Sequence, residues 1–593
     1  MGAIMLLSPN AEAFVSHPQG QVLAAIIFGD TGTSSAGFPV ISSQSFQLFL
    51  EQVPHLFETG ATLLDWLYKI EETLKTENTL ADPGKASAER AITVLKTVVQ
   101  TAAITAPGDL WLMGHVLSSW THAGLCQKLA RDEPLHLMRL ASSDGLNLAQ
   151  LRMDAHLLAA RGVLSKSSGP DAYVLAATAE ARGLVKQLAP LAPSWPCDWV
   201  AELRLAIAGK SSRTQASRLH KFLSLHEDYL PSTSWRPGPY EVMIGHRLLP
   251  IMLAYHQRGI PFDPTKGLPL PGLDLPLGQY LRPVLRAAGI IKSNDLLSLL
   301  GERVLTRGVG PFGIIHAYHP YFSSHGTRLS GNPSSQAWVV RADNIAASQD
   351  ANSRTFTMIN DALDRFVSRE GFKITTFIEH AVGEGEALRQ RYERSSEAGI
   401  CFVGADLENA AIDRARERQS QGILPPSAQF IRQADIGKPA YLVARLEELG
   451  VVTKGAVMVV GNGFHEVRQQ TNEGMIQIFR DYNQAGILLI FAEESALADQ
   501  DLINTAWNTY NAGFRYVHEI SGQGLRPAYD FDDETERFSW RHCAEAGGYW
   551  VHPGYTTHTR RIYPFTRVGA ANPAISTNYF CIPQYLQAAI KST

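Results

Sequence analysis

Cysteine is scarce in this chain, and no two cysteines stand close together. The five residues Cys126, Cys197, Cys401, Cys543 and Cys581 include no CxxC pair. Disulfide-stapled small domains and thiolate zinc sites both need cysteines in pairs or clusters. Their absence excludes these two classes and favours a reducing compartment such as the cytoplasm.

A membrane-spanning run and an excess of charge are missing as well. No apolar stretch reaches the roughly 20 residues that a spanning helix needs. The N-terminus lacks the basic residues of a signal peptide, and Leu6 breaks the myristoylation pattern. The formal net charge is −4 over 593 residues, so nothing points to a nucleic acid or another polyanion. We therefore expect a soluble, cytoplasmic protein.

What the chain does have is a regular alternation in its C-terminal half. Short apolar runs, each followed by a helical stretch, occupy residues 375–379, 401–405, 429–431, 456–460 and 487–491. This alternation is typical of a parallel doubly wound sheet, which binds ligands at the carboxyl ends of its strands. The sequence therefore predicts an α/β, Rossmann-like domain in this half.

Glycines and acids follow the first three runs. After the run that ends at Glu379 comes a turn with Gly383 and Gly385, where backbone can approach a ligand closely. The second run ends in Asp406, whose carboxylate can accept hydrogen bonds from both ribose hydroxyls of an adenosine cofactor. Asp435 follows the third run, where it can meet an adenine amino group.

The order of these features resembles that of class I (Rossmann-like) S-adenosylmethionine (SAM)-dependent methyltransferases. The turn lacks the third glycine of the dinucleotide fingerprint, and an NAD-binding or nucleotide-free domain is the alternative. The resemblance implies SAM as cofactor. The cofactor-binding residues that it implies are Glu379, Gly383, Gly385, Asp406, Leu407, Asp435, Ile436 and Asn462.

A histidine and an acid, His465 and Glu466, stand in the loop after the fourth run, where methyl transfer takes place in SAM enzymes. Two roles are open for the pair: the imidazole as general base, or imidazole and carboxylate together as metal ligands. Arg468 is a further candidate catalytic residue that can bond to cofactor or substrate, although a solvated helix face explains it equally well.

A second histidine, His518, lies 518 − 465 = 53 residues further on, and we expect it at the same rim. Two imidazoles and a carboxylate leave open positions on a metal ion. From about residue 230 onward the chain resembles the metal-dependent α-keto-acid C-methyltransferases. The resemblance implies an iron or zinc ion held by His465, Glu466 and His518, although a glutamate is one methylene longer than the family's aspartate.

Three functions follow from these residues. The first is metal-assisted methylation of the β-carbon of a 2-oxo acid in natural-product biosynthesis, where the ion would stabilise the enolate. Its proton-abstracting base is left open among His380, Glu466 and a metal-bound hydroxide. The second is metal-free O- or N-methylation of a small molecule with His465 as base. The third is a SAM-sensing regulator that binds DNA, against which the scarcity of basic residues argues.

The N-terminal half reads as mostly helical, with two winged-helix-like outlines at residues 146–175 and 281–306. We expect these units to form a lid and a homodimer interface, with the aromatic run 308–322 beside the substrate. Pro190–Pro196 reads as a linker, and Arg526 is a candidate partner of a substrate carboxylate. The predicted domains are 1–108 of unknown role, 109–230 winged-helix-like, 231–345 dimerisation and lid, and 346–593 SAM-binding and catalytic.

Overall fold

The computed structural model describes residues 18–591 except 35–36, 55, 77–81, 188–198, 257–262, 264–268, 332–340, 395–398, 506, 508, 510, 528–536, 562–563 and 565–573. The chain divides into two compact units. The helical unit takes its described residues from 1–340, 499–517 and 562–572. The sheet unit takes them from 341–498, 518–561 and 573–593. Each unit therefore contains segments that are distant in sequence.

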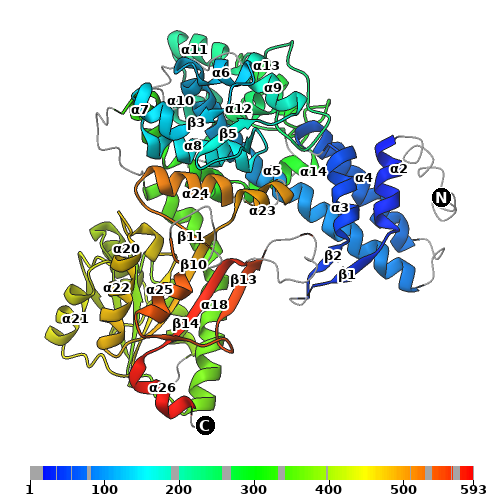
Figure 1. Ribbon diagram of the computed structural model, residues 1–593. Coiled ribbons are helices and arrows are strands. Elements are labelled where there is room, and N and C mark those ends of the chain that lie inside the picture. Colours follow the sequence, from blue (N-terminus) through cyan, green and yellow to red (C-terminus); the bar gives the residue numbers. More distant parts are fainter. Residues whose placement is uncertain are drawn as a thin grey trace. The chain divides into compact units, whose positions relative to one another are not determined.

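The sheet unit is built on a mostly parallel sheet (Figure 1). Its five parallel strands lie side by side in the order β8 (Gln429–Ile431), β7 (Cys401–Ala405), β6 (Thr376–His380), β9 (Ala456–Gly461) and β10 (Leu488–Ala496). Counted along the chain this order is 3-2-1-4-5, which is the order of doubly wound nucleotide-binding sheets. The carboxyl ends of these strands therefore share one edge of the sheet.

An antiparallel strand from the end of the chain completes the sheet. Strand β14 (Ala574–Ile582) pairs with β10, and its other side pairs with β12 (Trp550–Val551) and β13 (Thr557–Arg561). The short β11 (Arg526–Pro527) pairs in parallel with the end of β10. Because β14 covers β10, this long apolar strand does not present an open edge.

Both faces of the sheet are covered, which explains why its strands are apolar throughout. Neighbouring residues of one strand point to opposite faces, so Phe377 joins one hydrophobic core and Ile378 the other. The first core is closed by α18 (Arg341–Glu370), α19 (Glu386–Arg394) and α20 (Asn409–Ser420), and α26 (Gln584–Lys591) packs at its edge. The second is closed by α21 (Pro439–Glu448), α22 (Asn472–Gln484) and α25 (Trp540–Ala546).

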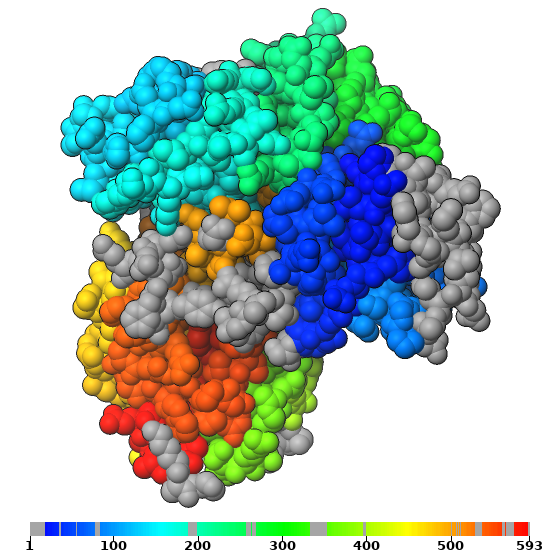
Figure 2. All heavy atoms as spheres, turned by 45° about the vertical axis from the view of Figure 1, so that its right-hand side comes forward, coloured from blue at the N-terminus to red at the C-terminus, as the bar shows by residue number. Residues whose placement is uncertain are grey.

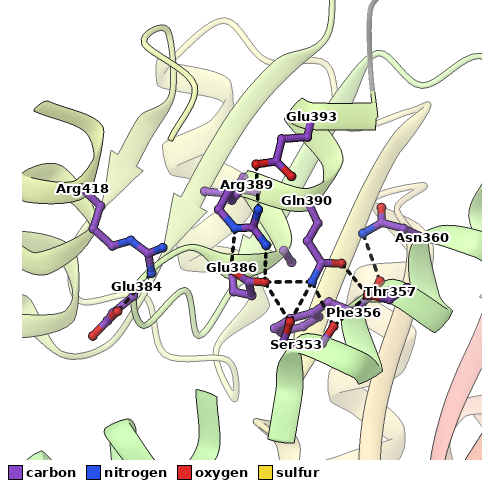
Figure 3. A network of polar contacts seen from close by, with 12 residues as sticks. Ser353, Phe356, Thr357, Asn360, Glu384, Glu386, Arg389, Gln390, Glu393 and Arg418 are labelled. Carbon is purple, nitrogen blue, oxygen red and sulfur yellow. Dashed lines mark hydrogen bonds and ion pairs between the residues drawn. The ribbon is translucent and has the colours of Figure 1, made fainter. Parts of the chain in front are cut away.

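Figure 3 shows how polar contacts fasten the start of α19 to α18. The Glu386 carboxylate accepts hydrogen bonds from Ser353 Oγ of α18 at 3.1 Å, from Gln390 Nε2 at 2.8 Å and from Arg389 Nε at 2.8 Å. Gln390 Nε2 also donates to the Ser353 carbonyl at 2.9 Å. The helix that follows the glycine turn is thereby held in place from outside the sheet.

The helical unit is organised around α5 (Asp82–His122), a 41-residue helix with Pro107 inside it. It packs against α4 (Phe57–Thr76), α12 (Pro239–His256) and α15 (Val309–His316). Gly245 of α12 lies so close to Leu110 that an added Cβ would come within 2.5 Å of the leucine side chain. The helix runs unbroken through residue 108, so the predicted division between residues 108 and 109 coincides with no element boundary.

The remaining elements of the helical unit are short. The atoms of α2, α3 and α4 lie together on its surface, in blue, in Figure 2. These elements are α2 (Pro18–Ile27), β1 (Thr31–Thr33), β2 (Pro39–Ile41), α3 (Ser43–Gln52), α6 (Leu125–Ala130), α7 (Leu137–Ser143), α9 (Ala179–Gln187), α10 (Trp199–Ile207), α11 (Arg213–Leu223), α16 (His319–Phe322), α17 (His325–Leu329), α23 (Asp499–Asn504) and the first part of α24 (Asn511–Ile520).

The two winged-helix-like outlines differ in which elements the structure shows. In the first, α8 (Leu148–Ala160) leads into a hairpin of β4 (Leu164–Lys166) and β5 (Ala172–Leu175), with β3 (Leu135–His136) on the outer side of β5. In the second, α13 (Gly278–Ala287) is followed by α14 (Leu299–Arg307), so residues 303–306 of this outline lie in a helix. Ser298 caps α14 by accepting the Gly301 N–H at 2.8 Å, which starts a helix there. Lid and dimer roles stay predictions.

The strand predictions agree with the structure more closely. Residues 401–405 and 429–431 are the observed bounds of β7 and β8, and β10 runs on past the predicted end at residue 491 to Ala496. The linker predicted at Pro190–Pro196 lies outside the described residues. Among the residues that the structure describes, no helix has the length and apolarity to cross a membrane.

Candidate functional site

The glycine turn after β6 leaves open space beside its backbone. Gly383 has φ +54° and Gly385 has φ +81°, a region that favours glycine, and a Cβ added at Gly383 would meet no atom within 4 Å. The Gly385 N–H closes the turn on the Val382 carbonyl at 2.7 Å, and α19 begins directly afterwards. The turn therefore leaves space in which a ligand can approach the backbone without a side-chain clash.

Glu379 holds the start of α19. Its buried carboxylate accepts the backbone N–H of Ala387 at 3.2 Å and that of Leu388 at 2.8 Å. Burial raises the pKa of Glu379 to about 8, and the two N–H bonds offset this only in part. Both oxygens of this predicted cofactor-binding residue are thus engaged in capping a helix.

Asp406 ties the end of β7 to the glycine turn. Its Oδ2 accepts the Gly383 N–H at 3.1 Å, and its Oδ1 accepts the Glu408 N–H at 2.9 Å. Leu407, the next residue, is 48% exposed and offers apolar surface beside Asp406. A carboxylate and an adjoining apolar surface can serve the sugar and the base of a nucleoside.

The loops after β8 and β9 reach the same edge. Asp435 Oδ1 accepts the Gly437 N–H at 2.9 Å, and the charge of Asp435 acts on His380 at the end of β6. A Cβ added at Gly463 would lie 3.4 Å from Ile436 Cδ1 and 3.5 Å from the Ala381 Cβ. The predicted cofactor residues of three strand ends therefore lie close together.

Three of these strand-end loops contain a non-glycine residue in the left-handed region. They are Ala381 (φ +60°) after β6, Gln433 (φ +56°) after β8 and Asn462 (φ +53°) after β9. Such conformations cost roughly 1–3 kcal/mol each and cluster at functional sites. The strained backbone at this edge is consistent with a binding site there.

His465 lies on the short helix η2 (Phe464–Glu466) and bonds to a buried acid that the sequence analysis did not single out. Its Nδ1 is 2.8 Å from Oε2 of Glu493, and the Phe464 and His465 N–H groups both donate to Oε1. Burial alone would lower the pKa of His465, but the charges of Glu493, Glu466 and Glu494 and the hydrogen bond raise it. The geometry is that of an imidazole oriented by a carboxylate.

His518 lies in the last turn of α24, with its ring next to that of His465. The two ring centroids are 4.7 Å apart and the ring planes are nearly perpendicular. Around them, the Gly524 N–H donates to the His465 carbonyl at 3.2 Å, and the Gln523 N–H donates to the His518 carbonyl at 2.9 Å. Backbone bonds thus hold together two histidines that are far apart in sequence.

The predicted metal site does not assemble from the described residues. Two imidazoles converge, but within that part of the chain no group of three His, Cys, Asp or Glu side chains could hold a metal ion. The carboxylate that bonds to His465 is Glu493, while Glu466 contributes charge near the ring and caps its own turn through its N–H to Gly463. The residues present therefore do not fit an ion held by His465, Glu466 and His518.

The two arginines lie in different environments, and the catalytic role of Arg468 stays a prediction. Arg468 is exposed in the turn after η2. Arg526 is fully buried and donates to Asn472 Oδ1 at 2.9 Å, to the Thr471 carbonyl at 2.9 Å and to the Phe538 carbonyl at 3.0 Å. Burial lowers its pKa to about 10. Its guanidinium is bound to protein acceptors, so the expectation that it pairs with a substrate carboxylate is wrong.

The important residue missing from the sequence analysis is Glu493. A signal for it exists, because Glu493 and Glu494 interrupt an otherwise apolar run, and both are buried in β10. Buried carboxylates are costly unless they are bonded, so two in one strand indicate a special role. Which residue such an acid bonds to depends on the fold.

Comparison with known proteins adds little to this geometry. No protein-family model and no curated protein matches the chain. Similar solved structures include mitomycin 7-O-methyltransferase MmcR, at 12% identity over 80% of this chain and 94% of that one, with a TM-score of 0.26. The CurJ carbon methyltransferase is 11% identical over 85% of this chain and 100% of that one, with a TM-score of 0.32. The O-methyltransferase NcsB1 from neocarzinostatin biosynthesis, in complex with SAM, is 13% identical over 52% of this chain and 84% of that one, with a TM-score of 0.31. TM-scores below 0.5 carry no argument about this chain.

Proposed function

We propose that the sheet unit binds SAM at the ends of β6, β7 and β8 and transfers its methyl group to a small molecule. In this proposal His465 removes the acidic proton of the acceptor, and no metal ion takes part. The observation that carries the proposal is the buried hydrogen bond between His465 Nδ1 and Glu493. It lies on the loop after the fourth parallel strand, next to the strand ends with the glycine turn and Asp406.

The hydrogen bond defines what each nitrogen of His465 does. A carboxylate only accepts, so Nδ1 carries the proton and Nε2 has the lone pair that makes it a base. When Nε2 takes a proton, the negative charge of Glu493 stabilises the imidazolium that forms. The raised pKa of His465 makes it a stronger base than a free imidazole.

The cofactor residues act by position. The turn at Gly383 offers backbone that the cofactor can approach without a side-chain clash, Asp406 offers a carboxylate for the ribose, and Leu407 offers an apolar surface for the adenine. When bound, SAM supplies an electrophilic methyl group, so the chain has only to align the acceptor and remove its proton. The strained loops after β6 and β9 fix the backbone on both sides of that alignment.

The acceptor class follows from the base. A neutral imidazole suits a hydroxyl, a nitrogen or a carbon next to a carbonyl, all of which give up a proton as the methyl arrives. A second candidate, metal-assisted C-methylation of a 2-oxo acid, is favoured by the 4.7 Å approach of His518 to His465. It requires a third ligand from outside the described residues, or from the substrate, and therefore ranks behind metal-free transfer.

Two measurements test the proposal. Titration calorimetry should give SAM binding by the wild-type protein and at least about tenfold weaker binding by Asp406→Asn, because the ribose contact is weakened. Labelled SAM with a panel of phenols, amines and 2-oxo acids should then yield methylated product, which His465→Gln reduces by about a hundredfold or more. Absence of SAM binding to the wild-type protein would contradict the proposal.

Chelation separates the two candidates. Activity that survives dialysis against a chelator supports His465 as base without an ion. Activity that is lost, and that returns with iron or zinc in the wild-type protein but not in His518→Ala, supports metal-assisted C-methylation.

A further inference from the structure

A cavity of about 560 Å³ lies in the helical unit, apart from the strand-end site. Its walls come from the C-terminal part of α5, from residues 144 and 146 before α8, and from α16 and α17. Small-molecule sites have volumes of roughly 300–1,000 Å³, so the cavity is large enough for a ligand. The residues considered below all belong to the helical unit, and nothing in the proposed methyl transfer uses them.

Asp154, on α8 behind this cavity, is fully buried and surrounded by hydrogen-bond donors. Its Oδ2 accepts from Trp120 Nε1 at 2.8 Å, and its Oδ1 accepts from Gln150 Nε2 at 2.8 Å and from Tyr516 Oη at 2.7 Å. His325 Nε2 lies 3.1 Å from the same Oδ1. A buried carboxyl group is costly without such partners, and here residues of four helices bond to one carboxyl group beside His325.

The bond to Asp154 fixes the direction of the His325 ring. His325 Nε2 also lies 3.2 Å from Gln150 Nε2 and 3.1 Å from Tyr516 Oη, both of which donate to Asp154 Oδ1. Since the carboxylate only accepts, we assign the ring proton to Nε2, where it makes a charge-assisted bond to Asp154. The other nitrogen, Nδ1, is then an acceptor, and it is buried without a hydrogen-bond partner in the part of the chain that the structure describes. His325 lines the cavity and is 2% exposed. A ligand in the cavity can supply the missing donor.

Other lining groups also offer lone pairs rather than protons. Ser323 Oγ donates its proton to the Pro320 carbonyl at 2.9 Å, and Ser330 Oγ donates to the Thr327 carbonyl at 3.0 Å. His122 Nδ1 lies 2.7 Å from the Ser118 carbonyl, so the proton of this ring is on Nδ1 and the lone pair on Nε2. With their protons donated to carbonyls, these three lining side chains can act as acceptors.

The charges of the lining point the same way. Among the described residues that line the cavity there is no lysine or arginine, and the acid among them, Asp144, pairs with Lys128 at 2.8 Å on the exposed side. Burial, followed by the neighbouring histidines, lowers the pKa of His115 well below its ordinary value, so this lining ring is uncharged.

We propose that this cavity is a binding site for the primary ammonium group of an alkylamine. An ammonium group carries three donors and no acceptor, which matches His325 Nδ1, His122 Nε2 and the serine oxygens. Asp144 adds a favourable charge, and the ring of Phe322 lines the space beside these acceptors for the alkyl chain. A neutral alcohol offers one donor, and a carboxylate offers none.

Binding of three probes of equal chain length tests this. Titration of the full chain with n-hexylammonium, n-hexanol and hexanoate should give at least tenfold tighter binding of the ammonium than of the alcohol, and no binding of the carboxylate. His325→Gln keeps a donor towards Asp154 but removes the Nδ1 acceptor, and it should weaken hexylammonium binding at least fivefold. Equal or tighter binding of hexanoate would overturn the proposal.

Two further variants make the result independent of folding. Asp144→Asn, an exposed change, should weaken hexylammonium about threefold, while Asp132→Asn, a matched acid of the same unit outside the cavity, should leave its affinity unchanged. His465→Gln in the sheet unit should also leave it unchanged, which separates this site from the proposed methyl transfer. Weakening by Asp132→Asn equal to that by Asp144→Asn would reduce the binding to surface charge and refute the site.

Discussion

The His465–Glu493 pair gives the rate of methyl transfer a defined pH dependence. The proposed base works only when His465 is uncharged, and its pKa is raised above the ordinary value near 6.5. The rate should therefore increase with pH and level off only above that raised pKa. Measuring kcat/KM of the wild-type protein between pH 5.5 and 9 with one acceptor tests this.

The same profile in Glu493→Gln identifies the cause. The charge and the hydrogen bond of Glu493 are the largest causes that raise this pKa, so without them the midpoint should move to lower pH while the plateau drops about tenfold to a hundredfold. His552→Gln, a histidine after β12 in the same unit, should leave the midpoint in place. An unshifted midpoint in Glu493→Gln would mean that another group limits the rate.

At position 381, glycine should give a more stable protein than the alanine that the chain has. With φ +60° it pays a penalty of about 1 kcal/mol that glycine avoids, although glycine loses more entropy on folding. Ala381→Gly should therefore raise the unfolding free energy of the sheet unit by about 0.5 kcal/mol. Ala387→Gly, in the buried first turn of α19, should lower it by about 1 kcal/mol or more, and urea unfolding compares the two.

At the level of single residues, the sequence was informative where chemistry is local. Gly383, Asp406 and His465 stand at strand ends that the apolar runs predict, so their placement follows from pattern. The partner of His465 does not follow from pattern, because Glu493 reaches it only once β9 and β10 lie side by side. For Arg526, the charge suggested a bond to a substrate carboxylate. In the structure its acceptors are two backbone carbonyls and the Asn472 side chain, which only the fold brings together.

At the level of elements, the end of β9 depends on close packing of α18. A Cβ added at Gly461 would lie 2.5 Å from the ring of Phe356, so Gly461→Ala must displace that ring or the strand. We expect a loss of about 1–3 kcal/mol in the unfolding free energy of the sheet unit, and weaker SAM binding because the Asn462 loop moves. Circular dichroism in urea and calorimetry measure both effects.

The control is the same substitution where space is open. A Cβ at Gly84, near the start of α5, would meet no atom within 4 Å, so Gly84→Ala should leave stability and SAM binding unchanged or slightly raise stability. Loss of stability in Gly84→Ala equal to that in Gly461→Ala would remove the steric explanation.

The strands that could be predicted from the sequence are those that are buried on both faces of the sheet. The strands of the parallel sheet read as continuous apolar runs because both faces are covered, and β7 was predicted to the residue. The end of β10 was missed because its buried glutamates look like a loop. Residues 303–306, the end of the second winged-helix-like outline, lie in α14, because Ser298 caps a helix that begins before them.

At the level of the whole molecule, the last strand protects the longest one. Removal of residues 574–593 should expose one side of β10, which is nine apolar-rich residues long, and the truncated chain should aggregate. Removal of residues 588–593 leaves β14 in place and should give a soluble protein with unchanged SAM affinity. Size-exclusion chromatography of the two truncated chains measures whether each aggregates. If the chain without residues 574–593 stayed soluble and did not aggregate, β14 would not be needed to protect β10.

The interleaving of the two units has a consequence for synthesis. A nascent chain emerging from the ribosome has delivered all five parallel strands by residue 496, yet the strand that shields β10 arrives only with residues 574–582. During the translation of those intervening residues, the half-built sheet presents a bare flank on which chaperones can act. Slow codons or a stalled ribosome in this stretch would prolong that exposure, so misfolding in the cell should depend on translation speed there more than anywhere upstream.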